Sequence, residues 1–582
     1  MGDIKTKLKY YIRSNEITCS LLNLYFAIRK GGIKNIKTMI NNEIYNHHCR
    51  KPWYVDKDEL KRQKASQVKY DIKVAFIVDC KDGLSNEILR TLDSISNQTM
   101  ENWLVCCVNC SEENKEKIDQ YTLNNKVNGL FYVGNIFIDF IEKNNISYIG
   151  KLMAGDVLHP FFMYRMIEEA DKSQSEIIYC DDNSFEKNIK KADTPRYKPD
   201  FSVDTLYSYN YIGRSYIMST DIYKKAGSGD ISGMDVFLYA IENNLKVSHI
   251  SDILYYEDKE VRKRISIDDL LRNENVSLQR HFEKMNVNAS IEKTTFKEVR
   301  HIKYDINDNP LVSIIIPNKD HIEDLSRCIN SIINKSSYKN YEIIVVENNS
   351  TEKETFEYYE KIKRENKAKV CIWEDEFNYS AINNFGKDFS NGEYIVLLNN
   401  DIEVISENWI EEMLMYAQRD RTGAVGCMLY YPDDTVQHAG VIVGIGGIAG
   451  HSHKHFKRGE KGYCDRMAAV QNMSAVTAAC MMTSRKCFEE AGGLDEKLKV
   501  AFNDIDYCMK LRKAGYDVIF TPFAEMYHYE SISRGYEDTS EKEARFRSEV
   551  NYFMDKWGDV IRRGDPYYNP HLTLRYEDFS LK

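Results

Sequence analysis

The stretch Val312-Ser-Ile-Ile-Ile-Pro-Asn318 decides the fold class. A continuous apolar run of this kind, closed by a proline, is typical of a strand that is buried on both faces. Residues 325–333 then place apolar side chains on one face of a helix, and the runs 343–346 and 394–398 repeat the strand pattern. Such strands alternating with amphipathic helices predict an α/β fold with a largely parallel, Rossmann-like sheet covered on both sides.

The same layout occurs about 240 residues earlier in the chain. Apolar runs at 74–78 and 105–108 flank a helical pattern at 88–95. A local similarity accompanies the layout, since Ser94-Ile95 followed by Asn102-Trp103 parallels Ser331-Ile332 followed by Asn340-Tyr341. A period of this length is too long for a solenoid, so it predicts two related domains in tandem.

Composition excludes several classes of protein. The 582 residues are 43% hydrophobic and 29% charged, which suits a folded chain with large cores. The 79 Lys and Arg against 89 Asp and Glu give a net charge of −10, so we expect no nucleic-acid partner. We find no apolar run of about 18 residues and no secretion signal, and therefore expect a cytoplasmic protein without a membrane span.

The cysteines include one CxxC, formed by Cys107 and Cys110 beside Cys106. A lone CxxC is weak evidence for metal or redox chemistry. It lies in the apolar stretch 104–108, which is predicted to be a buried strand. We therefore interpret these residues as core cysteines, with a metal or redox site as the minor alternative.

The first 51 residues are basic, with ten Lys and Arg against three Asp and Glu, and Leu21 to Ile28 add an apolar stripe near helical spacing. One interpretation is an arm that contacts an anionic membrane surface, on the inner face of the cell membrane. The other is a helix that packs on the body of the protein with its basic side in solvent. The second is slightly favoured, and both remain open.

Polar side chains follow the apolar runs of the C-terminal half at the point where each predicted strand ends. These segments are Pro317-Asn318, Glu347-Asn348-Asn349-Ser350 and Asn399-Asn400-Asp401. Ligands of open α/β sheets bind beyond the carboxyl ends of the strands, so two carboxylates reach one edge. Either alone is weak evidence, but the pair suits a nucleoside diphosphate with Mg²⁺ or Mn²⁺.

A second acidic cluster, Phe502-Asn-Asp-Ile-Asp506, opens a predicted helix that stops at Gly515. Asp504 and Asp506 are two residues apart, so they point in different directions and at most one addresses a substrate. The alternative is two acids placed at a helix N-terminus by the helix dipole. His528 follows the next strand, and a lone histidine is more often structural than a ligand.

Residues of about 311 to 540 resemble family 2 glycosyltransferases with the GT-A fold, in the bacterial branch that builds O-antigens, rhamnose-containing polysaccharides and other surface glycans. Each motif is short, but eight occur in the family's order. They are Val312-Ser-Ile-Ile-Ile-Pro-Asn318, Ile344-Val-Val-Glu-Asn-Asn-Ser350, Gly392-Glu-Tyr-Ile-Val-Leu-Leu-Asn-Asn-Asp401, Val436-Gln-His-Ala-Gly440, Ala475-Val-Thr-Ala-Ala-Cys480, Gly492-Gly-Leu-Asp-Glu496, Phe502-Asn-Asp-Ile-Asp506 and His528-Tyr-Glu-Ser531.

The resemblance implies a role for individual residues. It makes Asp504 the catalytic base and gives Asp401 and His528 to a divalent metal, Mg²⁺ or Mn²⁺. Two departures are present, since Glu347 replaces an Asp in the nucleotide pocket and Asn399 replaces the first Asp of the DxD-like motif. The residues implied to bind the nucleotide sugar are Pro317, Asn318, Glu347, Asn349, Asn384, Asn400 and Asp401.

The segment 71–260 resembles a degenerate family 2 domain that often precedes the catalytic one, and it keeps Tyr197-Lys-Pro-Asp-Phe201 and Asn210-Tyr-Ile-Gly213. Its site residues have changed, however. Val78-Asp79-Cys80 stands where Pro-x-Asn is expected, Asn109 replaces the nucleotide-pocket acid, and Tyr256 replaces the late histidine. Asp156 is the one acid left of the metal motif, and Asp235 persists at the position of the base.

The expected organisation is therefore a basic helical arm (1–70), a degenerate GT-A-like domain (71–260), a helical linker (261–309), a catalytic GT-A domain (310–560) and a C-terminal tail (561–582). The expected function is inverting transfer of a sugar from a UDP-, dTDP- or GDP-sugar to a cell-surface glycan or lipid-linked glycan. A bifunctional polymerase with two active domains and a non-catalytic glycan-binding scaffold are the alternatives. The segment Gly450-His-Ser-His-Lys-His455 lacks a usual zinc spacing. The resemblance implies a substrate-proximal loop at this place, so we interpret the segment as that loop.

Overall fold

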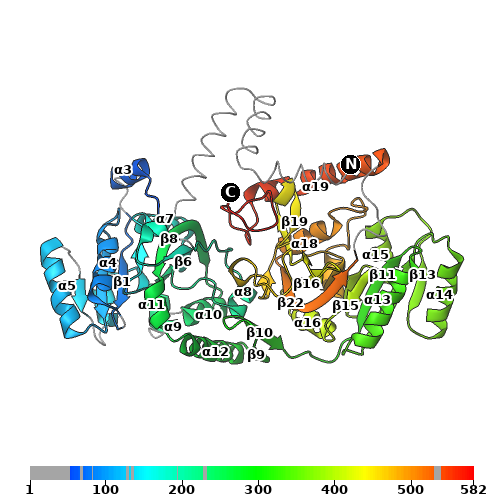
Figure 1. Ribbon diagram of the computed structural model, residues 1–582, viewed down its shortest axis with the longest axis horizontal. Coiled ribbons are helices and arrows are strands. Elements are labelled where there is room, and N and C mark those ends of the chain that lie inside the picture. The colour runs from blue at the N-terminus through cyan, green and yellow to red at the C-terminus, as the bar shows by residue number, and fades with distance from the viewer. Residues whose placement is uncertain are drawn as a thin grey trace, which may run out of the picture.

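The computed structural model describes residues 53–65, 70–81, 83–125, 130–132, 137–192, 194–226, 233–529 and 539–582. Two α/β units lie side by side along the long axis, with the N-terminal unit on the left and the C-terminal unit on the right of Figure 1. Most of the predicted basic arm lies outside the described residues. Its described part forms one helix, α3 (Lys57–Ala65).

The N-terminal unit is built on a sheet of eight strands in the order β3-β2-β1-β4-β7-β6-β8-β5. Neighbouring strands from β3 to β4 are parallel, β7 runs antiparallel to both its neighbours, β6 and β8 are parallel, and β5 is antiparallel to β8. The strands are β1 (Val74–Asp79), β2 (Trp103–Val108), β3 (Leu130–Tyr132), β4 (Tyr148–Met153), β5 (Val157–Leu158), β6 (Ile177–Phe185), β7 (Tyr216–Ser219) and β8 (Val247–Asp258).

The C-terminal unit repeats this topology strand for strand, in the order β13-β12-β11-β14-β21-β16-β22-β15 and with the same directions. Two short strands, β17 (Val436–His438) and β20 (Gln471–Asn472), extend the sheet, and β18 (Val441–Val443) pairs with β19 (Ala449–His451). The main strands are β11 (Val312–Asn318), β12 (Tyr341–Glu347), β13 (Lys369–Ile372), β14 (Tyr394–Leu398), β15 (Ile402–Val404), β16 (Thr422–Tyr430), β21 (Cys480–Ser484) and β22 (Asp517–His528).

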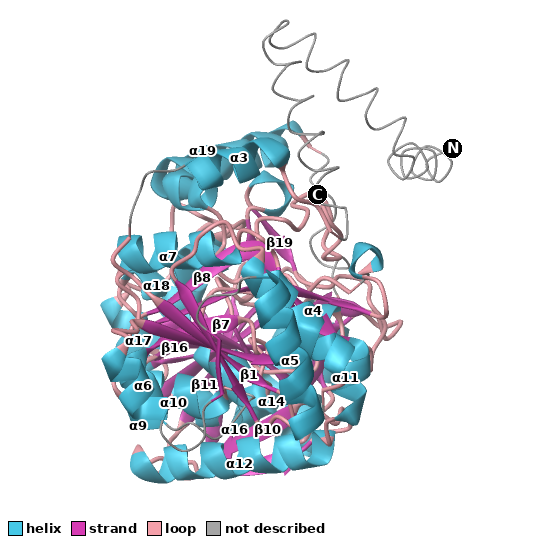
Figure 2. Ribbon diagram, turned by 90° about the vertical axis from the view of Figure 1, so that its left-hand side faces the viewer, coloured by secondary structure: helices cyan, strands magenta, loops and turns pink. Residues whose placement is uncertain are grey.

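Helices surround the strands, as Figure 2 shows. Several of them bury an apolar stripe against a sheet. Leu325, Cys328, Ile329 and Ile332 form the buried stripe of one of them, as the sequence predicted. The helices are α4 (Ser85–Ser96), α5 (Glu112–Asn125), α6 (Phe137–Lys143), α7 (Phe162–Ser173), α8 (Val203–Ser208), α9 (Thr220–Ala226), α10 (Met234–Glu242), α11 (Lys259–Arg264), α12 (Ile267–Lys284), α13 (Ile322–Lys335), α14 (Lys353–Arg364), α15 (Tyr379–Asp388), α16 (Trp409–Ala417), α17 (Arg485–Glu490), α18 (Asn503–Lys513) and α19 (Ser540–Arg563).

Strand register confirms the tandem repeat that the sequence predicted. Tyr148 pairs with Ser219 at the β4–β7 boundary, as Tyr394 pairs with Ser484 at the β14–β21 boundary. Tyr256 lies opposite the first residue of β5, as His528 lies opposite the first residue of β15. The α/β class and two tandem, mostly parallel sheets are therefore present.

Two of the predicted segments differ from expectation. The helical linker 261–309 contains α11 and α12, but then forms an antiparallel hairpin of β9 (Ala289–Lys293) and β10 (Arg300–Tyr304). Its strands have only five residues each and β9 is largely exposed, so they give no clear apolar run. The predicted tail does not begin at 561, because α19 runs to Arg563, and Leu572 beyond it is fully buried.

The two units share a packed interface. Arg419 Nη1 donates to Asp204 Oδ1 at 2.6 Å, and Asn569 Nδ2 donates to Asp181 Oδ2 at 2.7 Å. One continuous apolar cluster includes Phe282 of the N-terminal unit's side and Trp409 of the C-terminal unit. The units therefore form one body. Within the residues that the structure describes, no helix has the length and apolar character needed to cross a bilayer.

Candidate active site

A cavity of about 550 Å³ opens at the carboxyl ends of β11 and β14. This is the edge to which the strand-end residues were assigned from the sequence, and open α/β sheets bind their ligands there. Its wall includes Pro317, Asn318, Asn400, Asp401 and His528, all of them predicted site residues. The structure thus brings together residues that lie more than 200 positions apart.

Glu347 ends β12 beside this cavity and is almost completely buried. Its carboxylate accepts hydrogen bonds from the Ser350 amide at 2.5 Å, from the Ser350 hydroxyl at 2.6 Å and from the Tyr359 hydroxyl at 2.6 Å. Asn318 joins the same network, because its Nδ2 donates to the Tyr359 oxygen at 2.8 Å. Burial without these bonds would be costly for a carboxylate, so the network fixes Glu347 in one orientation.

The other three predicted asparagines differ in position, and only Asn400 lines the cavity. Asn400 Nδ2 donates to Asn318 Oδ1 at 2.7 Å, which couples the ends of β14 and β11. Asn349 has a left-handed backbone (φ 56°), and its side chain donates to the Asp375 carbonyl at 2.8 Å. Asn384 lies on α15 away from the cavity wall, and its amide instead contacts Leu494 of the Gly492–Glu496 turn.

Asp401 and His528 lie side by side, because β15 starts directly after Asp401 and pairs with the end of β22. His528 Nε2 is 3.2 Å from Asp401 Oδ1 and 3.2 Å from Asn399 Nδ2. On the other side of the ring, Nδ1 is 2.5 Å from Gln437 Oε1, so it carries the proton and donates to that amide oxygen. The Nε2 lone pair is therefore directed toward Asp401 and Asn399.

Asp504 lies in the first turn of α18, where the helix dipole favours a negative charge. Its Oδ2 accepts from the Ala478 amide at 3.1 Å. The Ala478 carbonyl in turn accepts from the hydroxyl of Tyr379, which lines the cavity. Asp506 points the other way into the protein, where Trp557 Nε1 donates to it at 2.7 Å. The divergence that the sequence predicted for these two acids is therefore observed.

The basic side chains that line the cavity were not predicted from the sequence. Lys319 and His321 follow the Pro317-Asn318 motif directly, and Lys542 and Arg545 reach the wall from α19. The first two follow the end of a predicted strand, so their position was a usable signal. Nothing in the local sequence relates α19 to a site more than 200 residues upstream. Lys319, Lys542 and Arg545 together give the cavity a positive side that suits diphosphate.

The histidine-rich loop does not gather a metal ligand set. His453 is fully buried, and its two ring nitrogens are engaged with Ser452 Oγ at 2.7 Å and the Tyr463 amide at 3.0 Å. His451 Nδ1 is 2.9 Å from His438 Nδ1. Burial disfavours the charged ring, so it lowers the pKa of His451 to about 4 and that of His453 well below 6.5.

The N-terminal unit has a different environment at the position that corresponds to Asp401. Asp156 precedes β5 as Asp401 precedes β15, but Asp156 is fully buried and paired with Arg214 at 3.1 Å. The same guanidinium contacts Glu257 at 2.9 Å, and the Tyr255 hydroxyl also donates to Asp156. A fixed arginine cation thus neutralises the one acid that this unit keeps of the metal motif.

The family model described as "Glycosyl transferase family 2" matches residues 313–490. These residues span β11 to α17 and include Asp401. Residues 313–490 are a family 2 glycosyltransferase domain. The match confirms the resemblance to family 2 glycosyltransferases.

Two long relatives extend the similarity beyond this domain. An uncharacterised protein, y4gI, of Sinorhizobium fredii is 35% identical over 523 residues, which cover 85% of this chain and 57% of that protein. The O-antigen biosynthesis protein RfbC of Myxococcus xanthus is 31% identical over 453 residues, covering 75% of this chain and 34% of its own length. The chain therefore spans between a third and three fifths of these relatives.

Shorter similarities are also present. An N-acetylglucosaminyl-diphospho-decaprenol L-rhamnosyltransferase of Mycobacterium tuberculosis is 28% identical over 107 residues, covering 17% of this chain and 35% of its own. Among solved structures, GalNAc-T7 with UDP, GalNAc and Mn²⁺ overlaps 47% of this chain and 52% of its own at 16% identity and a TM-score of 0.35.

Proposed function

We propose that the protein is an inverting glycosyltransferase that moves a sugar from a nucleoside-diphosphate donor to a growing cell-surface glycan or lipid-linked glycan. The observation that carries this proposal is the pairing of Asp401 with His528 at the wall of a cavity that also contains Asn318 and Asn400. A carboxylate, an imidazole and basic side chains at one strand edge suit a diphosphate with its metal ion. The family 2 match to residues 313–490 supports the same activity.

The donor set at Asp401 fits Mg²⁺ or Mn²⁺. An ion with bonds of about 2.1 Å to two adjacent octahedral ligands holds them about 3 Å apart, close to the 3.2 Å between Asp401 Oδ1 and His528 Nε2. Gln437 keeps the lone pair of His528 Nε2 available, as outer-shell partners of ligating histidines do. When bound, such an ion stabilises the negative charge that develops on the departing diphosphate.

Asp504 is the proposed general base. A base must take the proton of the acceptor hydroxyl as its oxygen attacks the anomeric carbon. The Ala478 amide donates to one carboxylate oxygen of Asp504 and fixes its position. The first turn of α18 orients the other oxygen. A single attack from the face opposite the leaving group inverts the anomeric centre.

The acceptor is proposed from the relatives. RfbC is named for O-antigen biosynthesis and the mycobacterial protein for transfer of L-rhamnose to a diphospho-decaprenol glycan, which suggests a surface glycan or its lipid-linked precursor for this chain. A cytoplasmic location would place the enzyme with its nucleotide-sugar donor. Residues 1–51 would then allow peripheral contact with the inner face of the membrane, through their ten basic side chains.

The deciding experiment compares donor binding and turnover in one preparation. UDP-, dTDP- and GDP-sugars are screened with Mn²⁺ for thermal stabilisation, because a ligand of the folded state raises the unfolding temperature. The stabilising donor is then assayed for hydrolysis and for transfer to glycan acceptors. Turnover that Asp401→Ala abolishes and the exposed Asp433→Ala retains supports the enzyme. Glycan binding without turnover of any donor would instead identify the non-catalytic scaffold.

A further inference from the structure

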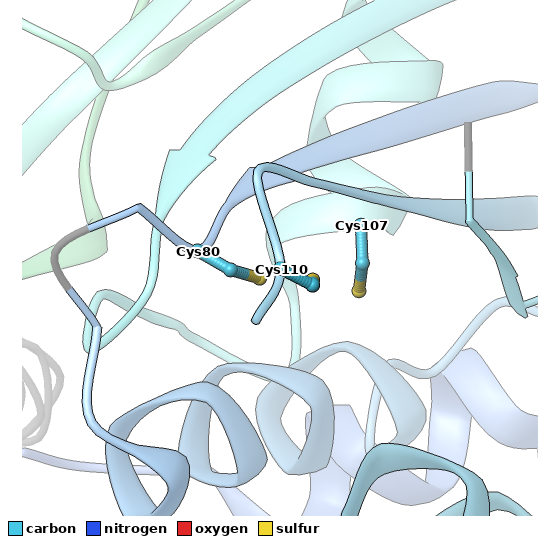
Figure 3. A group of neighbouring side chains, drawn as sticks. All are labelled: Cys80, Cys107 and Cys110. Atoms are coloured by element: carbon cyan, nitrogen blue, oxygen red, sulfur yellow. The ribbon is translucent and has the colours of Figure 1, made fainter. Parts of the chain in front are cut away.

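Three cysteines of the N-terminal unit meet at the edge of its sheet. Cys80 directly follows β1, Cys107 lies in β2, and Cys110 lies between β2 and α5. Their three sulfur atoms lie within 4.8 Å of one another, and Figure 3 shows the side chains directed toward a common space. Among the residues that the structure describes, no other group of three or more His, Cys, Asp and Glu side chains gathers in this way.

The backbone explains how the three sulfurs reach one face. β1 and β2 are parallel neighbours, and the Cys80 amide donates to the Val108 carbonyl at 3.0 Å. Successive side chains of a strand alternate, so Cys107 and Cys110 would normally point to opposite faces. Asn109 between them has a left-handed backbone (φ 56°), which turns the chain and returns Cys110 to the side of Cys107. The CxxC therefore closes around a turn, as metal-binding CxxC pairs do.

Cys106 provides the internal contrast. It is the neighbour of Cys107 on β2 and equally buried, but it packs in a different apolar cluster. Cys80 and Cys107 share a cluster with Val78, and Cys110 packs against it. The thiols of Cys80 and Cys110 also make long contacts, of 3.6 Å and 3.7 Å, each to the carbonyl two residues before it. Strand β2 thus places Cys106 in one apolar cluster and Cys107 in the other. Of these two, Cys107 is the one whose sulfur lies near two further thiols.

The position of the cluster in the fold is informative. Counted from the paired strand starts Val74 and Val312, Cys80 stands at the register position of Asn318. In the C-terminal unit Asn318 lines the cavity at the strand ends. The N-terminal unit therefore presents a thiol where its partner unit presents an amide, which replaces hard donors by soft ones.

We propose that Cys80, Cys107 and Cys110 form a thiolate site for a soft divalent cation, Zn²⁺ in chemical class. Tetrahedral zinc with bonds of about 2.3 Å to sulfur holds neighbouring sulfurs about 3.8 Å apart, so small side-chain rotations suffice from the observed spacing. Three thiolates leave the fourth position to water or a small ligand. Because Cys110 is only half-buried, the site has a solvent side through which the ion enters.

This site is distinct in chemistry from the one proposed at Asp401 and His528. Mg²⁺ and Mn²⁺ prefer oxygen donors, whereas three thiolates select zinc and its soft analogues. Binding at the N-terminal unit would join the ends of β1 and β2 to the start of α5. It therefore predicts a gain in stability that does not depend on any nucleotide sugar.

The test uses the full chain, reduced and freed of metal, with Co²⁺ as the spectroscopic probe. Thiolate-to-cobalt charge transfer in the near ultraviolet reports sulfur ligation alone, so Co²⁺ at oxygen and nitrogen donors does not interfere. We expect this band to saturate at one Co²⁺ per chain and to be displaced by Zn²⁺. Cys110→Ser replaces the least buried of the three cysteines. It should weaken Zn²⁺ binding by more than the roughly 10- to 100-fold that loss of an outer-shell partner costs, because it removes a ligand itself.

Cys106→Ser is the matched control, since it removes a buried thiol from the same strand and should retain the charge-transfer band. Cys80→Ser provides a second variant should Cys110→Ser change the fold, which thermal unfolding would reveal. The proposal is overturned if no sulfur charge-transfer band appears, or if Cys106→Ser loses it as fully as Cys110→Ser. It is also overturned if thiol counting of the native, unreduced protein shows a disulfide within the cluster.

Discussion

Asp504 and Asp506 lie two residues apart in α18, and their side chains point in different directions. Asp504 turns toward the loop before β21 and is only partly buried, whereas Asp506 is fully buried beneath α19. Lys556 Nζ lies 2.6 Å from Asp506, and Trp557 Nε1 donates to the same oxygen. The spacing in the sequence predicted the divergence, but only the fold shows that Asp506 anchors α19, which is why Asp504 is the one proposed as the base.

Asp504→Asn should therefore reduce sugar transfer by about 10²- to 10⁴-fold while donor binding is retained, because loss of a general base removes a contribution of that size. Asparagine keeps an oxygen for the Ala478 amide, so the loop should not move. Asp506→Asn is the matched comparison and should lower the unfolding temperature instead. A variant at Asp504 that keeps more than about a tenth of the rate would contradict the assignment.

Asp401→Ala and His528→Ala should each weaken the Mn²⁺-dependent affinity for the nucleotide. The two residues are remote in sequence but 3.2 Å apart, so removal of either eliminates one of two neighbouring donors. Calorimetric titration of the nucleoside diphosphate with and without Mn²⁺ measures the effect, with Asp433→Ala as the control. Unchanged Mn²⁺ dependence in both variants would place the ion elsewhere.

At the scale of elements, apolar runs and one helical stripe were sufficient to predict β11, β12, β14 and α13, because burial of both sheet faces imposes a strong pattern. The hairpin β9–β10 was not predicted, since β9 is largely exposed and the five-residue β10 buries the polar Arg300 and His301. Strand ends identified Asn318 and Asp401, which follow from local sequence. The contribution of α19 to the cavity depends on tertiary packing, which no local pattern encodes.

The start of α7 contains a pH-dependent contact. The His159 ring accepts from the Phe161 amide at Nδ1 and donates through Nε2 to the Tyr54 carbonyl at 2.9 Å, so it is neutral with both nitrogens in use. Burial disfavours the charged ring and lowers the pKa of His159 to about 4.

Acidification should therefore cost stability between pH 6.5 and pH 4. The unfolded chain takes up the proton near pH 6.5 and the folded chain only near pH 4, so this contribution is complete above pH 6.5 and is lost as the pH falls to 4. Thermal unfolding across this range measures it. His159→Gln should flatten part of the slope and the exposed His455→Gln should not; equal slopes in all three proteins would refute the contact's role.

For the molecule as a whole, two units with one topology have diverged at their sites while sharing an interface. The buried pair of Asp204 and Arg419 links them, and Asn472 Nδ2 donates to the other oxygen of Asp204 at 3.0 Å. A charged pair of this kind is costly to break, so the units should not separate in the folded protein. The N-terminal unit is thus held against the C-terminal unit.

The last prediction is that the N-terminal unit transfers no sugar. Asp156 is already neutralised by Arg214, so a divalent ion would have to displace a buried guanidinium to reach the carboxylate. Tyr256 in place of the late histidine offers no imidazole, and Asn109 offers no carboxylate to a ribose. Asp235 alone keeps the position of a base, at the start of α10, and contacts Arg280 at 3.4 Å.

A product-length and linkage assay of Asp235→Asn beside Asp504→Asn tests whether the protein has one working transferase site or two. Asp235 is preferred to Asp156 for this purpose, because removal of a buried, paired carboxylate leaves an uncompensated charge and costs about 3–5 kcal/mol in its own right. We expect Asp235→Asn to preserve every linkage and Asp504→Asn to remove them all. Loss of one linkage in Asp235→Asn with survival of the other would show two working sites and a bifunctional polymerase, because a purely supporting unit has no base whose loss could be specific to one bond.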